Sequence, residues 1–342
     1  MSQIDSVFDT AIAGAGPAGL VAAVRLARAG RRVILLDRAV TDTPKIGESL
    51  PASIETLFAK LDLAPLESPP HRRIPGSLSL WAGEIRSQDF VMQAEGSGWR
   101  LDRLAFEQSL ANQALQAGVS RYDAWLKHCQ LTDQGWGIET EDGHKVRAKW
   151  LVDATGRRSV ASKIHNIKKQ KSPPLIAIWG IGKATQNLVP DARTITESDD
   201  SGWWYAAHLP DHRPLAIYHT SAAKAPVLKQ EPQRWLKQLV QSRLISKHID
   251  PEAFANTELR ATDARTAWLS NAYGDHWIAT GDAALCFDPL SSQGIFNAIA
   301  ISDMATKAIL SSNSDKALIQ YQQKLDEVRN IYYFGKRLPD TN

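Results

Sequence analysis

The sequence has little cysteine, and this scarcity narrows the kinds of site that the chain can hold. Its 342 residues include two cysteines, Cys129 and Cys286, which are not in C-x-x-C spacing. Neither a redox pair nor a cysteine-based metal site is therefore predicted. The nine histidines are scattered without zinc-like spacing, so no metal is expected. Two unpaired thiols suit a reducing compartment, and we expect a cytoplasmic location.

An excess of charge of either sign is also lacking. The chain has 40 basic and 37 acidic residues, for a formal net charge of +3. This balance gives no electrostatic case for binding nucleic acid. The N-terminus lacks a basic segment followed by an apolar core, and no apolar run is long enough to span a bilayer. We expect neither a signal peptide nor insertion into a membrane.

What the sequence does contain is a glycine-rich turn between an apolar run and a helical pattern. Gly14, Gly16 and Gly19 have G-x-G-x-x-G spacing. The first follows the mostly apolar run 7–13, and the last lies in the first turn of a helix predicted over 17–30. Gly14 allows a tight turn, Gly16 lets the backbone approach a pyrophosphate, and Gly19 lets the helix pack on the strand. The free N–H groups at the start of the helix complete a site for phosphates.

A second predicted strand supports this interpretation. Residues 32–36 (RVILL) lead into Asp37, which lies 23 residues after Gly14 (37 − 14 = 23). An acidic residue at this spacing meets the ribose hydroxyls of an adenosine. The pattern predicts dinucleotide binding and leaves FAD, NAD and NADP open. No second G-x-G-x-x-G occurs, so no separate nicotinamide domain is predicted.

The rest of the chain interleaves two kinds of segment. We predict strands at 77–81, 88–92, 119–131, 135–140 and 145–153, an antiparallel sheet within 173–222, and helices at 52–61, 233–246, 293–311 and 314–334. A further helix begins after Asp102, a good N-cap residue, and a hairpin turns at 141–143. We expect a discontinuous dinucleotide-binding domain formed by 1–75, 97–172 and 269–342. The segments 76–96 and 173–268 form an inserted substrate domain.

Three motifs in order resemble those of FAD-dependent monooxygenases of the aromatic-hydroxylase fold. The first is the glycine loop with Asp37-Arg38, the second is the run 153–159 (DATGRRS), and the third is the run 281–284 (GDAA) followed by 288–294 (DPLSSQG). The resemblance selects FAD over NAD. It implies an α/β fold in which a Rossmann-like FAD-binding domain, of the glutathione-reductase and aromatic-hydroxylase type, carries an inserted antiparallel β-sheet substrate domain.

The resemblance also assigns residues to the cofactor. Asp282, at the end of a strand, would accept hydrogen bonds from the ribityl hydroxyls, although it could also cap the segment that follows. The helix that starts at 293–295 would present its N–H groups to the pyrimidine edge of the flavin. Asp153 would brace the flavin loop. The full expected set is Gly14, Ala15, Gly16, Pro17, Ala18, Gly19, Asp37, Arg38, Gly47, Glu48, Ser49, Arg103, Leu126, Asp153, Gly156, Gly281, Asp282, Pro289, Gln293, Gly294 and Ile295.

The run 47–49 (GES), together with 288–294, resembles a branch that contains flavin-dependent halogenases, geranylgeranyl-type reductases and halogenase-like monooxygenases. Within it, the chain is most similar to flavoprotein maturases of tryptophylquinone (CTQ) amine oxidases and dehydrogenases. The run 203–210 (WWYAAHLP) resembles the halogenase W-x-W-x-I-P element imperfectly, because its tryptophans are adjacent. Halogenases carry a lysine in the strand that corresponds to 75–81 (PGSLSLW), and this chain has none there.

Five residues are candidates for catalysis. Pro289 would lie beside the flavin face and offers a carbonyl without an N–H, although Asp288-Pro289 could also form only a turn. His208 is a possible acid or base by residue type. Trp204 could line the substrate cavity or pack in a core. The candidate set is Pro289, Ser292, Glu48, His208 and Trp204.

The resemblance implies an FAD-dependent monooxygenase that hydroxylates an indole ring through a flavin C4a-hydroperoxide. O2 is the co-substrate, and NAD(P)H or another reductant reduces the flavin transiently. The expected substrate is a tryptophan of a partner protein during quinone cofactor biogenesis, and the chain itself is expected to be a monomer or a homodimer. Two alternatives stay open: a halogenase or hydroxylase of a small aromatic molecule, and a flavin-binding maturation chaperone without turnover.

Overall fold

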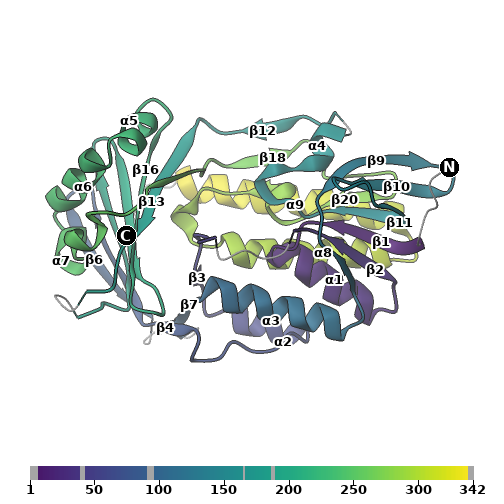
Figure 1. Ribbon diagram of the computed structural model, residues 1–342, viewed down its shortest axis with the longest axis horizontal. Helices are drawn as coiled ribbons and strands as arrows, with labels where there is room; N and C mark the ends of the chain where they lie inside the picture. The colour runs from purple at the N-terminus through teal and green to yellow at the C-terminus, as the bar shows by residue number, and fades with distance from the viewer. Residues whose placement is uncertain (1–6, 39–42, 91–95, 165, 186–188, 338–342) are drawn as a thin grey trace.

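A computed structural model describes residues 7–38, 43–90, 96–164, 166–185 and 189–337. Two large sheets lie at opposite ends of the molecule, and helices pack against each of them (Figure 1). In the described part of the chain, no helix combines the length and the apolar run that a membrane span requires.

The first sheet has a parallel centre, as the glycine-rich turn predicts. Its order is β19-β20-β11-β1-β2-β8, and β10 and β9 extend it through β11. β1 pairs in parallel with both β2 and β11, so the glycine loop leaves the middle of the sheet. The strands are β1 (Val7–Ala13), β2 (Val33–Leu36), β8 (Ser120–Tyr122), β9 (Leu126–Thr132), β10 (Gly135–Thr140), β11 (Lys145–Asp153), β19 (Tyr273–Gly274) and β20 (Trp277–Ala279).

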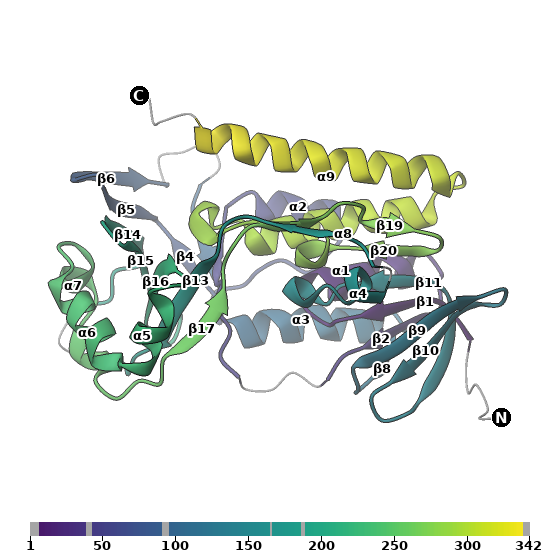
Figure 2. The same cartoon turned by 90° about the horizontal axis from the view of Figure 1, so that it is seen from above.

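Long helices cover this sheet. α1 (Pro17–Arg28) packs against α3 (Arg103–Gln116) and α8 (Gly294–Leu310), while α9 (Ser314–Arg337) lies along α8 (Figure 2). α2 (Ile54–Lys60) is shorter than the predicted helix at 52–61. The predicted cap of α3 is confirmed, because the Asp102 carboxylate accepts a hydrogen bond from the Ala105 N–H at 2.9 Å. β10 and β11 form the predicted hairpin.

The second sheet has the order β17-β13-β16-β15-β14-β5-β6. The strands within 173–222 pair antiparallel, as predicted, and one parallel pair, β14 with β5, joins the segment 76–89 to them. The strands are β5 (Gly76–Trp81), β6 (Glu84–Asp89), β13 (Leu175–Ile181), β14 (Thr194–Asp199), β15 (Gly202–His208), β16 (Pro214–Ser221) and β17 (Arg260–Asp263). Pairing of β5 and β6 with β13 to β17 supports the proposed inserted domain, whose boundaries remain a proposal.

One local prediction for this sheet needs correction. β6 begins at Glu84 rather than at Gln88, because Ala82 and Gly83 have φ values of 49° and 87° and close a tight hairpin turn. Residues 91 and 92, at the end of the predicted strand, lie outside the described residues.

The predicted helix at 233–246 is divided into α6 (Pro232–Gln241) and α7 (Ile245–His248). The Glu197 carboxylate causes the break by accepting hydrogen bonds from the backbone N–H groups of 243, 244 and 245. With α5 (Ala225–Gln230), these helices cover the outer face of the second sheet (Figure 1).

Two three-stranded sheets lie between the two units, which are the first sheet with α1, α3, α8 and α9 and the second sheet with α5 to α7. One contains β3 (Ser49–Leu50), β7 (Gly98–Arg100) and β4 (Arg72–Ile74), and the other contains β12 (Lys169–Lys171), β18 (Ala267–Leu269) and β21 (Leu285–Cys286). Both cysteines are free.

The alternation of side chains along β15 and β16 decides what faces the first unit. Trp204 and Tyr218 point toward α5 to α7 and belong to the core beneath those helices. Tyr205 and Ile217 point the other way, into a separate apolar cluster on the inner face. This inner face forms one side of the site.

Candidate active site

A cavity of about 360 Å³ lies between the glycine loop and the inner face of the second sheet. Residues far apart in the sequence meet there, which is what the three motifs predict. The lining comes from the loop after β1, the GES loop (Gly47-Glu48-Ser49), the loop after β11, strands β13, β15, β16 and β17, the turn at Asp282, the loop after β21, and the start of α8. The predicted residues among them are Gly16, Pro17, Ala18, Gly47, Glu48, Ser49, Arg103, Gly156, Asp282, Pro289, Ser292, Gly294 and Ile295.

Two helix N-termini open into this cavity. α1 begins after Gly16 and α8 begins after Gln293, and neither start has a side-chain cap or an acidic residue in its first turn. Their N–H groups and positive dipole ends are therefore available to a ligand. One end suits a pyrophosphate and the other an electron-rich ring edge.

The glycines fit a dinucleotide as the motif predicts. A Cβ at Gly19 would lie 1.8 Å from the Gly14 carbonyl oxygen, so this position needs glycine for close packing of the helix. Gly14 has a φ of +105° and lies against Ala154. A Cβ at Gly16 or Gly294 would meet no atom within 4 Å, so at both positions space is kept free beside the cavity. The residues present fit FAD.

The residues expected at the adenosine end, Asp37, Arg38 and Leu126, do not line the cavity. Asp37 accepts hydrogen bonds from the backbone N–H of Ala15 and from the indole N–H of Trp125. Arg38 pairs with Glu141 and lies over the Trp125 ring, 4.2 Å from its centroid. Leu126 is half-buried at the start of β9. The proposed contact of Asp37 with a ribose stays a prediction.

Arg103 holds the GES loop in place. Its Nη1 donates hydrogen bonds to the carbonyl oxygens of Ile46 and Gly47, at 2.6 and 2.7 Å. Its Nη2 pairs with the buried carboxylate of Glu107 at 2.6 Å, and Lys45 pairs with the other oxygen of that carboxylate. The resemblance assigned Arg103 to the cofactor, and the structure shows it on the wall of the cavity as a brace for the loop.

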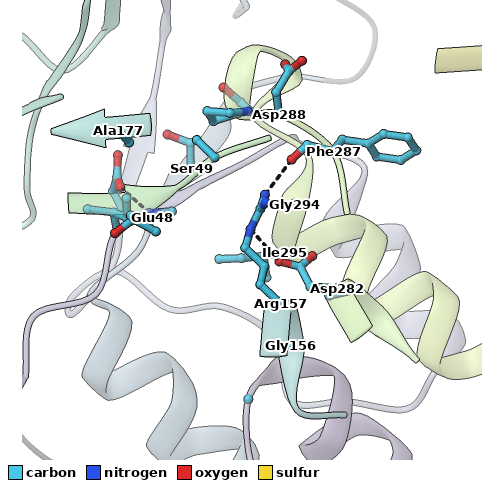
Figure 3. A pocket seen from close by; sticks show the side chains of 18 of the residues that line it. Glu48, Ser49, Gly156, Arg157, Ala177, Asp282, Phe287, Asp288, Gly294 and Ile295 are labelled. Atoms are coloured by element: carbon cyan, nitrogen blue, oxygen red, sulfur yellow. Dashed lines mark hydrogen bonds and ion pairs between the residues drawn. The ribbon is translucent and has the colours of Figure 1, made fainter. Parts of the chain in front are cut away.

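Arg157 joins the second and third motifs (Figure 3). Its guanidinium donates hydrogen bonds to the carbonyl oxygens of Arg265 and Phe287 at 2.6 and 2.8 Å, and Nε lies 3.6 Å from the carboxylate of Asp282. Asp153 accepts two hydrogen bonds from Thr155 at 2.9 and 2.6 Å, which hold the turn before Gly156.

The carboxylate of Asp282 faces the cavity, and its side chain is 37% exposed. Burial raises its pKa, and the positive charges of Arg157, Lys169 and Arg103 oppose that rise. A carboxylate in this position is a strong acceptor for hydroxyl groups of a ligand.

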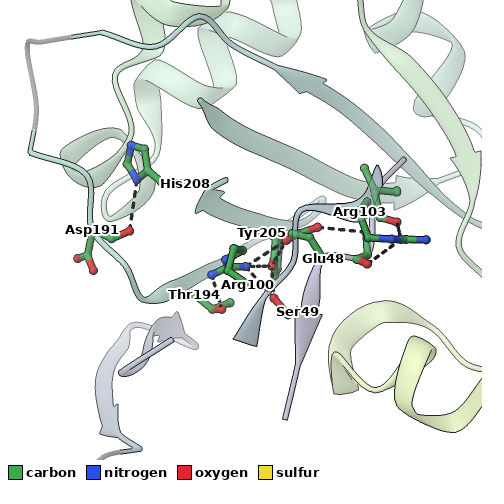
Figure 4. Close-up of polar contacts among 10 residues, drawn as sticks. Glu48, Ser49, Arg100, Arg103, Asp191, Thr194, Tyr205 and His208 are labelled. Carbon is green, nitrogen blue, oxygen red and sulfur yellow. Dashed lines mark hydrogen bonds and ion pairs between the residues drawn. The ribbon is translucent and has the colours of Figure 1, made fainter. Parts of the chain in front are cut away.

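A buried polar network lies behind the GES loop (Figure 4). Nη1 of Arg100 donates to Glu48 at 3.1 Å, to the Ser49 hydroxyl at 2.7 Å and to the Tyr205 hydroxyl at 2.6 Å. Its Nη2 donates to Thr194 at 3.0 Å, and the Tyr205 hydroxyl donates to Glu48. Burial raises the pKa of Tyr205, so its hydroxyl keeps its proton.

The loop after β21 brings Pro289 and Ser292 to the cavity. Asp288 accepts a hydrogen bond from the Leu290 N–H at 3.2 Å and another from the Tyr332 hydroxyl of α9. Ser292 has a φ of +51°, an uncommon conformation for serine, and its N–H donates a hydrogen bond to the Pro289 carbonyl at 3.0 Å. Glu48, Pro289 and Ser292 are thus brought together.

The structure does not bring Trp204 and His208 to this cavity. Trp204 is 1% exposed and packs against Tyr218 and Trp235 on the far side of the sheet. His208 has the same parity along β15, and its ring lies beside the Asp191 carbonyl, apart from the network of Glu48 (Figure 4). The expectation that these two residues line the cavity is corrected, because side chains of a strand alternate between its faces.

Sequence reasoning missed Arg100, Tyr205 and His219. Tyr205 and His219 line the cavity, and Arg100 lies behind it. The alternation of side chains along 203–208 could have identified Tyr205. If Trp204 packs in a core, Tyr205, the next residue, points to the opposite face of the sheet. No local pattern marks Arg100 or His219, because their partners are distant in the sequence. Among the described residues, no group of three or more His, Cys, Asp or Glu side chains could hold a metal ion.

Comparison with known proteins gives consistent matches. A family described as "Tryptophan halogenase" matches residues 84–330, and an "FAD binding domain" family matches residues 7–49. The putative FAD-dependent oxidoreductase LodB of Marinomonas mediterranea is 29% identical over 96% of this chain and 91% of that protein. The flavin-dependent halogenase gsfI of Penicillium aethiopicum is 26% identical over 83% of this chain, and the match spans 60% of its length.

A solved structure shares the fold. It is the peptidyl tryptophan dihydroxylase QhpG, described as essential for tryptophylquinone cofactor biogenesis. It superposes with a TM-score of 0.78 at 23% identity, covering 94% of this chain and 72% of QhpG. The predicted fold, a Rossmann-like FAD-binding unit with an added β-sheet, is confirmed.

Proposed function

The chain belongs to the tryptophan halogenase family of FAD-dependent oxidoreductases, and from this premise we propose that it hydroxylates the indole ring of a tryptophan in a partner protein. QhpG acts on a peptidyl tryptophan by its description, and its fold spans nearly all of this chain. That likeness motivates the choice of substrate.

The cofactor of the proposed reaction is FAD. The start of α1 would hold its pyrophosphate, Asp282 its ribityl hydroxyls, and the start of α8 the edge of its flavin ring. When bound and reduced, by NAD(P)H or by another donor, FAD supplies the electrons that activate O2. The protein binds the cofactor, orients the ring that is attacked and keeps water out.

The composition of the cavity wall carries the proposal. Among the described residues that line it, the cationic side chains are Arg103 and Arg157, and no lysine is present. Both arginines are engaged with backbone carbonyls and carboxylates. An amine that could handle hypohalous acid, as the halogenase lysine does, is therefore lacking in this wall. Together with the lack of lysine in β5 (Gly76–Trp81), the strand where the resemblance places the halogenase lysine, this favours transfer of oxygen over transfer of a halogen.

The size of the cavity favours a large substrate that enters from outside. At about 360 Å³ it is at the low end of pockets for drug-sized ligands, which are about 300–1,000 Å³. The flavin ring and its ribityl chain would take the side next to the glycine loop and α8, which leaves the side next to the second sheet for one ring of a substrate whose remainder lies outside. Leu290, next to Pro289, is 45% exposed, and Trp81 on β5 is 38% exposed. Exposed apolar side chains around a functional site fit a protein partner.

Mass spectrometry distinguishes the proposal from its alternatives. Holoenzyme, a reductant and O2 should add oxygen atoms to a tryptophan of the partner polypeptide. Incorporation of chlorine or bromine would support halogenation instead. A chaperone without turnover would bind its partner equally well after the FAD site is disabled, and would leave its mass unchanged.

A further inference from the structure

His219 lies in the part of the cavity wall that the second sheet forms. Neither the expected FAD contacts nor the proposed reaction gives this histidine a role. His219 is on β16 and is 1% exposed, and its side chain lines the cavity together with Ile217 and Tyr205. These three residues share the inner face of the sheet. The glycine loop and the start of α8 lie on the opposite side of the cavity and offer the cofactor contacts.

A tryptophan fixes the orientation of this imidazole. The rings of His219 and Trp203 stack with centroids 3.6 Å apart and an interplanar angle of 11°. The two residues are paired across β15 and β16. Trp203 in turn lies 6.3 Å from the partly exposed ring of Trp81. The imidazole therefore ends an aromatic row that begins at the surface, on the side away from the glycine loop.

The two nitrogens of the imidazole differ in their access to the cavity. Nδ1 is covered by protein, and the structure gives it no hydrogen-bond partner among the described residues. Burial lowers the pKa of His219 to about 3, so the ring is neutral and has one N–H and one lone pair. Because Nδ1 is enclosed, Nε2 is the nitrogen that a molecule in the cavity can reach. In the tautomer with its proton on Nδ1, Nε2 is an acceptor.

We propose that His219 accepts a hydrogen bond from the indole N–H of the substrate and thereby determines which edge of the ring faces the flavin. This inference rests on the proposed function, since it takes an indole as the substrate. The only polar atom of an indole is a donor, so it needs an acceptor when it is buried. The flavin ring also has an N–H, but the contacts offered to the cofactor lie across the cavity from His219.

Binding of two small probes to the FAD-loaded protein tests this assignment. The probes are N-acetyltryptophanamide and its N1-methyl derivative, and perturbation of the flavin absorbance reports binding. Wild-type protein should bind the unmethylated probe about tenfold more tightly, because methylation removes the donor and leaves a buried acceptor unpaired. His219→Phe should bind the two probes with equal affinity. His219→Asn keeps an acceptor oxygen and should retain part of the preference.

Control measurements separate this role from others. His128→Phe replaces an exposed histidine of β9 and should leave the tenfold preference unchanged. In ¹⁵N NMR spectra of the wild-type protein, the Nε2 resonance of His219 should shift with the unmethylated probe and not with the methylated one. If His219→Phe fails to fold or to retain FAD, this spectrum and His219→Asn carry the test.

Three results would overturn the inference. The first is an unchanged preference in His219→Phe, and the second is lack of measurable binding of either probe by wild-type protein. The third is a His219→Phe variant that binds FAD more weakly but still prefers the unmethylated probe, which would mean that His219 bonds the flavin and not the substrate. A wild-type protein that discriminates between the probes but adds no oxygen to a partner tryptophan would contradict the proposed function and leave the His219 assignment intact.

Discussion

The guanidinium of Arg100 lies 3.1 Å from the carboxylate of Glu48, and both side chains are 2% exposed. Arg100 is the last residue of β7, and Glu48 belongs to the GES loop at the cavity. Through Tyr205 and Thr194 the same arginine contacts the second sheet. A single buried cation thus links the loop expected beside the flavin to the sheet expected above it.

Removal of this cation should destabilise the protein strongly. Arg100→Met leaves the Glu48 carboxylate buried without its main partner, and we expect a loss of about 3–5 kcal/mol in the free energy of unfolding. Urea denaturation measures it. Arg100→Met combined with Glu48→Gln should recover part of the loss. Arg73→Met, which breaks the half-exposed pair with Glu55, should cost about 1 kcal/mol or less. Equal losses in the two single variants would contradict this account.

The glycines of the loop should respond differently to one added methyl group. Gly16 has a φ of −76°, and its Cβ would enter free space, so Gly16→Ala should fold normally and bind FAD weakly. Gly19→Ala would place a Cβ 1.8 Å from a carbonyl oxygen and should lower the melting temperature. Thermal denaturation and FAD titration of both variants check this contrast. Normal FAD affinity in Gly16→Ala would refute the assigned path of the pyrophosphate.

Asp282→Asn should make the FAD-free protein more stable and its FAD affinity lower. Burial raises the pKa of Asp282, so the ionised carboxylate is disfavoured in the folded state. Above the raised pKa of Asp282, the variant should have the larger free energy of unfolding, because wild-type protein then buries a charged carboxylate. The difference should vanish as the pH falls below the ordinary pKa range of aspartate, where the carboxyl is neutral in both the folded and the unfolded state. Melting temperatures from pH 3 to pH 8 and the flavin content of the purified variant test both parts. Unchanged flavin content would argue against Asp282 as a cofactor contact.

Trp204→Ala should affect stability without affecting the cofactor. Trp204 packs with Trp235 and Tyr218 beneath α5 to α7, and we expect a loss of about 3–5 kcal/mol. The FAD affinity of the folded variant should match that of wild-type protein. If Trp204→Ala lost FAD binding or turnover while its stability stayed unchanged, Trp204 would have a role in the active site.

The sequence predicted the parts of the fold that depend on local chemistry. Gly14 and Gly19 fit the tight turn and the close helix–strand packing that their spacing predicts, and Asp102 caps α3 as its position indicates. The three motifs meet at one cavity because the carboxyl ends of parallel strands lie at the same edge of a sheet.

Long-range partners could not be predicted in this way. The break between α6 and α7 depends on Glu197, which is 46 residues from the nearest N–H that it accepts. Arg100 reaches Tyr205 over 105 residues, and the parallel pairing of β14 with β5 brings together two inserted segments. The sequence alone is compatible with Trp204 in the cavity or in a core. Side chains of β15 alternate between its two faces, so Trp204 can be placed only once it is known which face its neighbour Tyr205 occupies.

The most direct test of the central claim is co-expression of this chain with the polypeptide encoded beside it, followed by mass spectrometry of that polypeptide. The proposal predicts that a tryptophan gains the mass of one or two oxygen atoms, and that the gain disappears when Gly16→Ala replaces the wild-type chain. Chlorine or bromine on the ring, or a partner that stays unmodified while a small aromatic molecule is oxidised, would contradict it.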